Sequence, residues 1–435
     1  MRRLILVLIL VSLLMMPVAA QETLVPIAEP MPLVDENAYD IVNVLLLGMA
    51  THNEGSNGLT DSMMVVSFNR DTGHTAIVSL PRDLYVYMPN MGEMGKLNQA
   101  YYYGEKKADD GFTGLDELKA TILYNLGLQI DYTARLNFNG FIRLIDRLGG
   151  VEMSVDCGIQ DWRLKSPELD RTLEENYEKF TLEPGVYTLD GDTALWYVRS
   201  RKTSTDLDRG RRQQDILRAI WRMIRTQGVV GSLPTLWESW GDIITTDIPF
   251  ETALTYLPDV VDLDTSDISY FTFRIKKEVN NGYTPDADQR YILVPDRAAI
   301  AAMMQQVVAP TTGNQVTTAR PTIAIVNATG DSYFDYLAQV AADRLELDGF
   351  KTTIVAEATS SRNYNHIVDY TGETKGGKLE TIMRVLSTTV EGVEVTPQAE
   401  RAFDYKVYIG YNYQFYACTR PIIPPAPEAT PTPNG

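Results

Sequence analysis

The chain has 435 residues, of which 57 are acidic and 39 are basic, so its formal net charge at pH 7 is −18. An apolar fraction of 44% is ordinary for a globular protein, and this length predicts two or three domains. Two cysteines exclude a disulfide scaffold, and the negative charge repels a phosphate backbone, which argues against a nucleic-acid partner. Any site for an anion must therefore be local.

The N-terminus has the pattern of a secretory signal peptide over residues 1–20. Two arginines precede the apolar run Leu4–Met16, and Pro17 leads into small residues that end at Ala20. An uncleaved anchor is the alternative, because this apolar segment approaches the length that spans a bilayer. Both interpretations place the rest of the chain outside the cytoplasmic membrane, secreted or tethered to it. Residues 21–39 are rich in proline and acidic residues, as is typical of a linker.

Residues 40–310 alternate between strand and helix patterns. This order predicts one large α/β domain with helices on both faces of a mixed sheet, a three-layer α-β-α arrangement. The expected strands are residues 42–49, 63–68, 75–80, 132–138, 151–155, 194–198 and 291–294. The expected helices are 115–126, a segment capped by Asn139 and ended by Gly149, and a segment from Arg209 to Gly228 capped by Asp208. Residues 158–179 are polar and resemble an exposed excursion.

The remainder predicts a linker at 311–320, a small α+β domain at 321–415 and a proline-rich extended tail at 416–435. The expected strands of the small domain are 322–327, 352–356, 366–370 and 405–411, and its expected helices are 333–347 and 379–386. Cys157 and Cys418 form the only possible internal disulfide. The sequence leaves open whether they pair or remain free thiols.

One dense basic segment stands out in this acidic chain. Its cations are Arg199, Arg201, Lys202, Arg209, Arg211 and Arg212. If residues 194–201 form a strand, Arg199 and Arg201 share one face. If a helix begins at Arg209, then Arg209, Arg212 and Gln213 share a face beside its N-terminal backbone donors. The two faces would converge on a phosphate or diphosphate, whose oxygens match arginine side chains in pairs. The alternative is a solvated surface loop.

Other chemical signals are few. The sequence has no paired metal-binding histidines, no Walker loop, no glycine-rich dinucleotide turn and no nucleophile elbow. Arg82 and Asp83 follow the expected strand that ends at Leu80, and Lys96 lies in a glycine-containing loop. Asp61, at the end of another loop, has the side chain to hold a metal.

Several short motifs follow one another in this region. In chain order they are NVLLLG (43–48), TDSMM (60–64), SLPRD (79–83), KLNQAY (96–101), NFNGF (137–141) with DRLGGV (146–151), LDG (189–191) through YVRSR (197–201), and DRGRRQQ (208–214). Their order and spacing resemble the LytR-CpsA-Psr family across roughly residues 40–224. Residues 321–413 resemble, more weakly, the LytR C-terminal domain that often follows in this family.

The resemblance implies a membrane-associated extracytoplasmic phosphotransferase. Such enzymes move a glycopolymer from a polyprenyl-diphosphate carrier onto peptidoglycan or another wall glycan and form a phosphodiester link. The residues that would grip the diphosphate by position are Arg82, Lys96, Arg199, Arg201, Arg209, Arg212 and Gln213. Arg82, Asp83 and Arg209 would be catalytic, Asp61 would help to hold Mg²⁺, and an apolar pocket between sheet and helices would take the polyprenyl chain.

Two positions depart from the family pattern. Ala50 stands where an aspartate is usual after the first strand, and Leu59 stands where an arginine is usual before the Thr-Asp pair. A second metal carboxylate and one phosphate contact are therefore missing, and weaker Mg²⁺ binding is expected, with the substrate phosphates supplying ligands. The alternative function is a degenerate family member that binds polyprenyl-phosphate lipid or wall glycan without efficient turnover.

Overall fold

The computed structural model describes residues 29–34, 39–51, 59–107, 111–202, 206–226, 241, 243–261, 263, 268–308, 320–373 and 378–413. The expected signal segment, most of both expected linkers, the proline-rich tail and Cys418 lie outside these residues. Within the described ranges, none of the helices has the length and apolar character needed to cross a bilayer.

A six-stranded mixed sheet forms the centre of the large domain, with the order β11-β6-β1-β2-β3-β12. Its strands are β1 (Ile41–Met49), β2 (Thr60–Asn69), β3 (Thr75–Ser79), β6 (Tyr132–Leu136), β11 (Thr245–Thr246) and β12 (Ile268–Thr272). β1, β2 and β3 are antiparallel neighbours, whereas β6 runs parallel to β1 and β12 runs parallel to β3. Gly73, with φ of 72°, closes the β2–β3 turn in a conformation that glycine adopts without strain.

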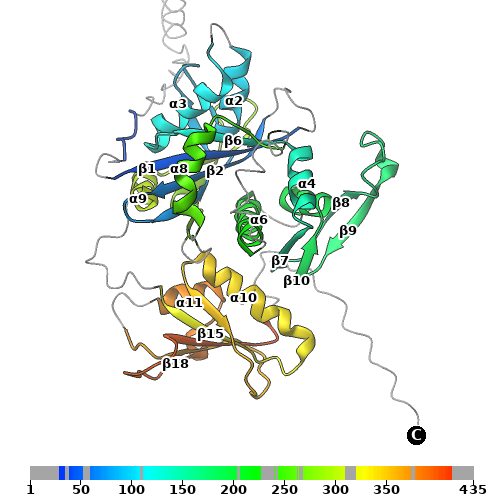
Figure 1. Ribbon diagram of the computed structural model, residues 1–435, viewed down its shortest axis with the longest axis vertical. Coiled ribbons are helices and arrows are strands. Elements are labelled where there is room, and N and C mark those ends of the chain that lie inside the picture. Colours follow the sequence, from blue (N-terminus) through cyan, green and yellow to red (C-terminus); the bar gives the residue numbers. More distant parts are fainter. Residues whose placement is uncertain are drawn as a thin grey trace, which may run out of the picture. The chain divides into compact units, whose positions relative to one another are not determined.

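Helices cover both faces of this sheet (Figure 1). Side chains alternate across a strand, so Leu45 and Leu47 face the core under α2 (Leu97–Lys106), α3 (Gly114–Leu126) and α9 (Arg297–Val308). Leu46 and Met64 face the opposite side, where α6 (Asp206–Thr226) packs through Leu217. The predicted three-layer α/β arrangement is therefore confirmed.

A second core lies beside α6. It joins α4 (Phe138–Arg147), β7 (Val151–Val155), β8 (Ile159–Leu164), β9 (Tyr177–Leu182), β10 (Gly185–Leu189) and α5 (Gly191–Arg199). β7 pairs with β10 and β8 pairs with β9, and a short 3₁₀ turn, η1 (Glu174–Asn176), precedes β9. The smaller elements of the domain are β4 (Tyr85–Met88), β5 (Glu93–Lys96), α8 (Phe250–Val261), β13 (Val279–Tyr283) and β14 (Tyr291–Pro295).

Three local expectations were wrong. Residues 194–198 are helical, because α5 begins at Gly191 and the Asp190 side chain caps its first turn by accepting a hydrogen bond from the Thr193 amide. α4 is capped by Asn137 rather than Asn139. α6 begins at Asp206, so Asp208 lies inside its first turn instead of capping it. The polar stretch at 158–179 is largely exposed, as expected, and the strands β8 and β9 pair within and just beyond it.

Residues 321–413 form a five-stranded sheet with helices. Its elements are β15 (Thr322–Asn327), η4 (Ser332–Phe334), α10 (Asp335–Leu347), β16 (Lys351–Ile354), β17 (His366–Asp369), α11 (Leu379–Val385), η5 (Val390–Gly392), β18 (Val393–Val395) and β19 (Tyr405–Ile409). The strand order is β16-β15-β19-β17-β18, and α10 and α11 bury Leu337, Leu345 and Ile382 against it. The pattern of two helices and several strands agrees with the α+β prediction.

Buried ion pairs join α6 to α10. Arg218, whose side chain is 3% exposed, lies 3.2 Å from the Glu346 carboxylate and 3.5 Å from that of Asp343. Burial of charge is costly unless it is paired, so these contacts hold the two helices in one register. The described residues from Met31 onward belong to one compact unit. Cys157 is disulfide-bonded.

Candidate active site

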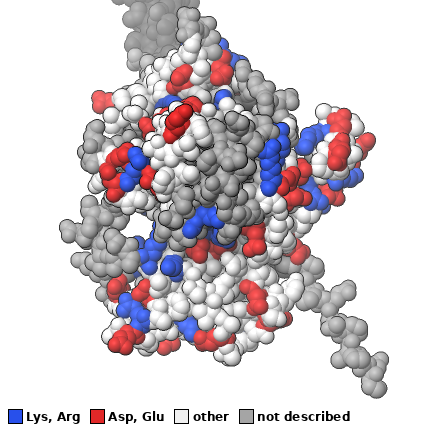
Figure 2. Space-filling view, viewed as in Figure 1, with Lys and Arg blue, Asp and Glu red and all other residues white. Residues whose placement is uncertain are grey.

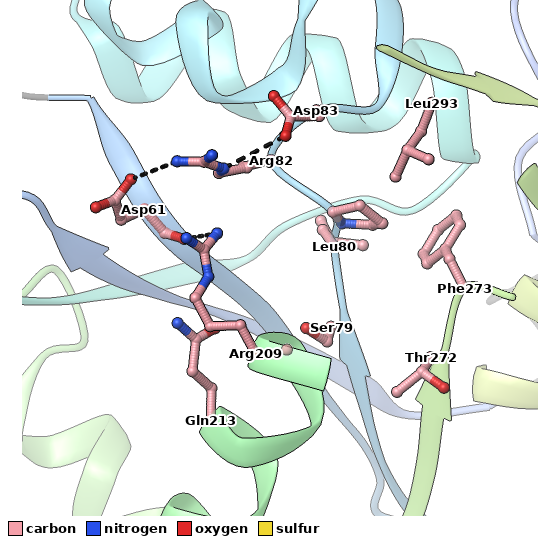
Figure 3. Close-up of a pocket in the computed structure, with 12 residues that line it drawn as sticks. Asp61, Ser79, Leu80, Arg82, Asp83, Arg209, Gln213, Thr272, Phe273 and Leu293 are labelled. Atoms are coloured by element: carbon pink, nitrogen blue, oxygen red, sulfur yellow. Dashed lines mark hydrogen bonds and ion pairs between the residues drawn. The ribbon is translucent and has the colours of Figure 1, made fainter. Parts of the chain in front are cut away.

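A small polar pocket lies where β3 ends and α6 begins (Figure 3). Its polar lining consists of Asp61, Ser79, Arg82, Asp83, Arg209, Gln213 and Thr272, and Leu80, Phe273 and Leu293 complete it on the apolar side. The cavity of about 30 Å³ has room for roughly two waters, too little for a sugar ring. We call it the phosphate pocket, because its lining suits phosphoryl oxygens.

Arg82 connects the two carboxylates of the phosphate pocket. Its Nη1 lies 3.3 Å from Asp61 Oδ1, and its Nε lies 3.5 Å from Asp83 Oδ2. Lys96 Nζ approaches the other Asp83 oxygen at 2.7 Å. Lys96 therefore reaches the site through Asp83 and does not line the pocket itself, which differs from the direct diphosphate contact expected for it.

Arg209 enters the pocket from the first turns of α6. Its side chain is nearly buried, and Nη2 donates to the backbone carbonyl of Asp61 at 3.4 Å. The next residue is Gly210, where a Cβ atom would lie 3.0 Å from Ser79 Oγ. A glycine at this position lets the helix approach β3 closely, so that Arg209 reaches β2 across the end of β3.

An apolar cavity of about 220 Å³ opens beside the phosphate pocket. Residues of β1, β6, α4, α5 and α6 line it, among them Leu46, Ala134, Phe141, Val198 and Ile220. Asp61 and Gln213 line both cavities. Polar and apolar compartments therefore meet at these two side chains.

Arg199 and Arg135 lie at the apolar cavity. Arg199 is positioned by α5, with its guanidinium 4.0 Å from the centre of the Phe138 ring. Burial lowers the pKa of Arg199, and the charge of Asp61 partly opposes this effect. Arg135 donates to Tyr101 Oη at 3.2 Å. Arg135 was not predicted as a site residue. An arginine in a strand that pairs with the buried β1 could have indicated that it belongs to a site.

Two of the arginines expected at the diphosphate lie elsewhere. Arg212 is 2% exposed and donates to the backbone carbonyls of Tyr197 and Ser200, the latter at 2.6 Å. The end of α5 leaves these carbonyls without helical partners, and Arg212 satisfies them. Arg201 is exposed and lines neither cavity, while its backbone amide donates to Asp161 at 3.1 Å. Residues 194–199 are helical and Arg201 lies beyond the end of α5, so the shared strand face proposed for Arg199 and Arg201 does not exist.

Asp61 is the sole acidic residue shared by the two cavities and the best-placed metal ligand. Among the described residues, no three histidine, cysteine or acidic side chains gather as a metal-binding group. Ala50 follows β1, and its backbone amide donates to Leu59 at 3.2 Å. This donor set suits Mg²⁺ only in partnership with substrate phosphates, because Mg²⁺ is commonly held by one or two carboxylates plus phosphate oxygens.

Positive charge is concentrated locally at this site. Arg82, Arg209, Lys96 and Arg199 surround Asp61 and Asp83, so cations outnumber carboxylates. Over the view of Figure 2, Lys and Arg occur in small groups among many Asp and Glu side chains. An anion is therefore attracted by the pocket itself and not by the field of the whole chain.

Thr272, Phe273 and Leu293 were not expected from the sequence. Thr272 and Phe273 come from the end of β12, and Leu293 of β14 donates its amide to the Asp83 carbonyl at 2.9 Å. These positions carry no chemical motif. The pairing of β12 with β3 brings Thr272 and Phe273 to the pocket, and the bridge between Leu84 and Leu293 brings β14.

The sequence matches the LytR_cpsA_psr family over residues 17–297, more than half of the chain, and the protein belongs to this family. The polyisoprenyl-teichoic acid–peptidoglycan teichoic acid transferase TagT of Bacillus subtilis is 28% identical over 229 residues, covering 52% of this chain and 65% of that protein. The corresponding TagU of Oceanobacillus iheyensis is 30% identical over 220 residues, covering 50% of this chain and 62% of that protein. The chain therefore spans less than two thirds of the length of these relatives.

A solved structure supports the fold class. The crystal structure of Bacillus subtilis TagV is 21% identical and has a TM-score of 0.50, with 62% of this chain and 99% of that chain covered. The similarity confirms the mixed α/β architecture of the large domain.

Proposed function

We propose that the protein is a phosphotransferase that moves a glycopolymer from a polyprenyl-diphosphate carrier onto peptidoglycan or another wall glycan. The observation that carries the proposal is the junction at Asp61 and Gln213, where the phosphate pocket meets the apolar cavity. A polyprenyl diphosphate has the same two parts, an apolar chain and a charged head, joined directly. The names of TagT and TagU describe transfer of a polyisoprenyl-linked teichoic acid, a reaction of this class.

In the proposed reaction, a hydroxyl oxygen of the acceptor glycan attacks the phosphorus that bears the glycopolymer. The bond from this phosphorus to the bridging oxygen breaks, polyprenyl phosphate leaves, and the polymer is joined to the acceptor by a phosphodiester. Negative charge builds on the transferred phosphoryl group and on the leaving group. Arg82 and Arg209 lie where they would stabilise this charge, inside a pocket that admits little water.

The remaining site residues would have supporting roles. Asp83 would accept the proton of the attacking hydroxyl, and Lys96 and Arg82 position its carboxylate. Asp61 would hold Mg²⁺ together with the substrate phosphates, and bound Mg²⁺ would neutralise part of the diphosphate charge. Arg199 would contact the phosphate nearest the lipid, since it lines the apolar cavity. Gln213 would orient the diphosphate between the two cavities.

The proposed reaction also has a location. A lipid-linked donor is held at a membrane surface, so we propose an extracytoplasmic enzyme whose residues 1–20 direct secretion or provide an anchor. We further propose that residues 321–413 are a LytR C-terminal domain.

The test is donor turnover. The chain from Gln21 onward is incubated with a short-chain polyprenyl-diphosphate glycan and a wall-glycan acceptor, and release of polyprenyl phosphate is followed by mass spectrometry. Arg209→Ala should lower the rate by about 10²–10³-fold, as expected for loss of a donor to transition-state charge. Arg401→Ala, at an exposed position outside both cavities, is the matched control. EDTA should abolish release, and added Mg²⁺ should restore it.

Donor that binds without release under any divalent ion would overturn the transferase proposal. The missing carboxylate at Ala50 would then mark the protein as a carrier-lipid or wall-glycan binder.

A further inference from the structure

A larger polar cavity, of about 480 Å³, adjoins the phosphate pocket. We call it the basic cavity. Its walls come from α6, β12 and α9 on one side and from α10 and α11 on the other. Its charged lining consists of the cations Arg211, Arg274, Lys277, Arg344 and Arg384 and the carboxylates Glu278 and Asp348. Cations therefore outnumber carboxylates in a chain whose net charge is −18.

The inner cations of the basic cavity are structural. Arg211 lies 2.6 Å from the Asp156 carboxylate, and Arg344 lies 3.8 Å from the same oxygen. Burial by itself raises the pKa of Asp156, but these two cations outweigh it and the pKa is lowered. Asp156 thus stays charged and fixes Arg211 and Arg344 in place.

The outer cations are available to a ligand. Lys277 and Arg384 have side chains that are 58% and 56% exposed. Lys277 shares the Glu278 carboxylate, at 3.4 Å, with Arg274, at 3.0 Å, so two cations face one buried anion. Arg384 lies 2.7 Å from the partly exposed Asp348. Arg384 can exchange the partly exposed Asp348 for a phosphate at little cost, because such exposed pairs contribute only about 0–1 kcal/mol. Lys277 can bind a phosphate because Arg274 remains paired with the buried Glu278.

The three cavities follow one another in a fixed order. Asp61 and Gln213 belong to both the apolar cavity and the phosphate pocket, and Thr272 belongs to both the phosphate pocket and the basic cavity. Gln214 Nε2 donates to the Phe271 carbonyl at 3.0 Å and ties α6 to β12 along this border. The apolar cavity, the phosphate pocket and the basic cavity therefore lie in this order. A lipid-linked anionic polymer has its lipid, diphosphate and polymer in the same order.

We propose that the basic cavity binds the first repeat units of an anionic donor polymer, such as a polyol phosphate or another phosphate-bearing glycan. This inference rests on the proposed transferase function and adds to it a polymer-binding site that residues 321–413 help to form. The cavity has the volume that the phosphate pocket lacks. Because α10 and α11 form one wall, residues 321–413 take part in donor recognition.

The test compares two donors with the full chain. One is a polyprenyl diphosphate that carries a disaccharide and a short polyol-phosphate chain, and the other carries the disaccharide alone. The variant is Lys277→Gln/Arg384→Gln, which removes one exposed cation from each wall and leaves Arg274 to pair with Glu278. The control is Lys351→Gln/Arg401→Gln, which removes the same charge from exposed positions outside the basic cavity. KM, kcat and equilibrium binding of each donor are measured at low and high salt.

The double variant should raise KM for the polyol-phosphate donor about three- to twentyfold without changing kcat, with no effect on the disaccharide donor. The difference should shrink at high salt, where exposed charges are screened. An unchanged KM for the polyol-phosphate donor, or an equal rise for both donors, would overturn the inference. If the unmodified chain turns over neither donor, the transferase proposal fails. Equilibrium binding then tests the role of the basic cavity. Tighter binding of the polyol-phosphate donor that is lost in the double variant supports the inference, and equal affinity for both donors overturns it.

Discussion

Ser62 on β2 donates a hydrogen bond of 2.9 Å to the side-chain carbonyl oxygen of Gln213 on α6, across 151 positions of sequence. The Gln213 amide nitrogen in turn donates to the Val198 carbonyl at 3.4 Å. Sheet and helices thus hold one amide at the junction of the apolar cavity and the phosphate pocket. The Gln213 amide at this junction is therefore already oriented in the structure.

Removing this bond should affect catalysis more than stability. In Ser62→Ala, the Gln213 oxygen loses its partner and the amide is free to rotate, so we expect kcat to fall about two- to fivefold. The free energy of unfolding should fall by about 1 kcal/mol or less. Steady-state kinetics and urea unfolding measure the two effects. A Ser62→Thr variant keeps the hydroxyl and should retain the wild-type rate; equal losses in both variants would contradict the assignment.

Arg212 should act as a structural residue. Truncation in Arg212→Ala leaves the carbonyls of Tyr197 and Ser200 unpaired and opens a void, so we expect the free energy of unfolding to fall by about 2–4 kcal/mol in urea titration. The exposed Arg201→Ala variant should be as stable as the wild type. Full stability of Arg212→Ala combined with weakened donor binding would instead place Arg212 in the site.

Asp215 should make stability depend on pH. Burial raises its pKa from 3.8 to about 6, although Arg211 and Arg218 oppose the shift. The folded state therefore keeps this proton where the unfolded state has lost it. The resulting stabilisation is complete below about pH 4 and disappears as the pH rises through 6, by up to about 3 kcal/mol.

Replacing Asp215 with asparagine removes that contribution. The free energy of unfolding of the wild type, minus that of Asp215→Asn, should decrease between pH 4 and 6.5. Glu251→Gln, which removes an exposed carboxylate from α8, is the matched control. Parallel stability curves for the wild type and Asp215→Asn would show that the buried carboxyl does not titrate in this range.

The apolar cavity should discriminate donors by the length of the lipid. Ala134 lines it from β6, and Ala134→Leu fills space equivalent to about three methylene groups. We expect affinity for a long polyprenyl diphosphate to fall roughly sixtyfold, since each of the three displaced methylenes contributes about 0.8 kcal/mol. Affinity for a diphosphate with a single prenyl unit should stay constant. Ala253→Leu, a half-buried alanine of α8 outside the cavity, controls for added bulk, and equal weakening of both donors would place the lipid elsewhere.

The sheet of the large domain could be predicted from sequence because its strands are strongly apolar or flank clear turns. Val42–Met49 and Thr75–Leu80 lie within one residue of β1 and β3 at each end. The segment at 194–198 could not be read correctly, because its Leu, Trp, Tyr and Val favour a strand while the Asp190 cap and the packing of α5 on α6 select a helix. The phosphate pocket brings together, as expected, Asp61, Arg82, Asp83, Arg209 and Gln213. Arg212 lies elsewhere because it binds carbonyls at the end of α5, the helix that was predicted as a strand.

β12 completes the central sheet at its edge, beside β3, and supplies Thr272 and Phe273 to the phosphate pocket. Nearly two hundred positions separate the strand partners Ser79 and Thr272 in sequence. In a chain that emerges from its N-terminus, Arg82 and Arg209 therefore appear before the strand that encloses them. A truncated product that ends before β12 would have both arginines but an open pocket.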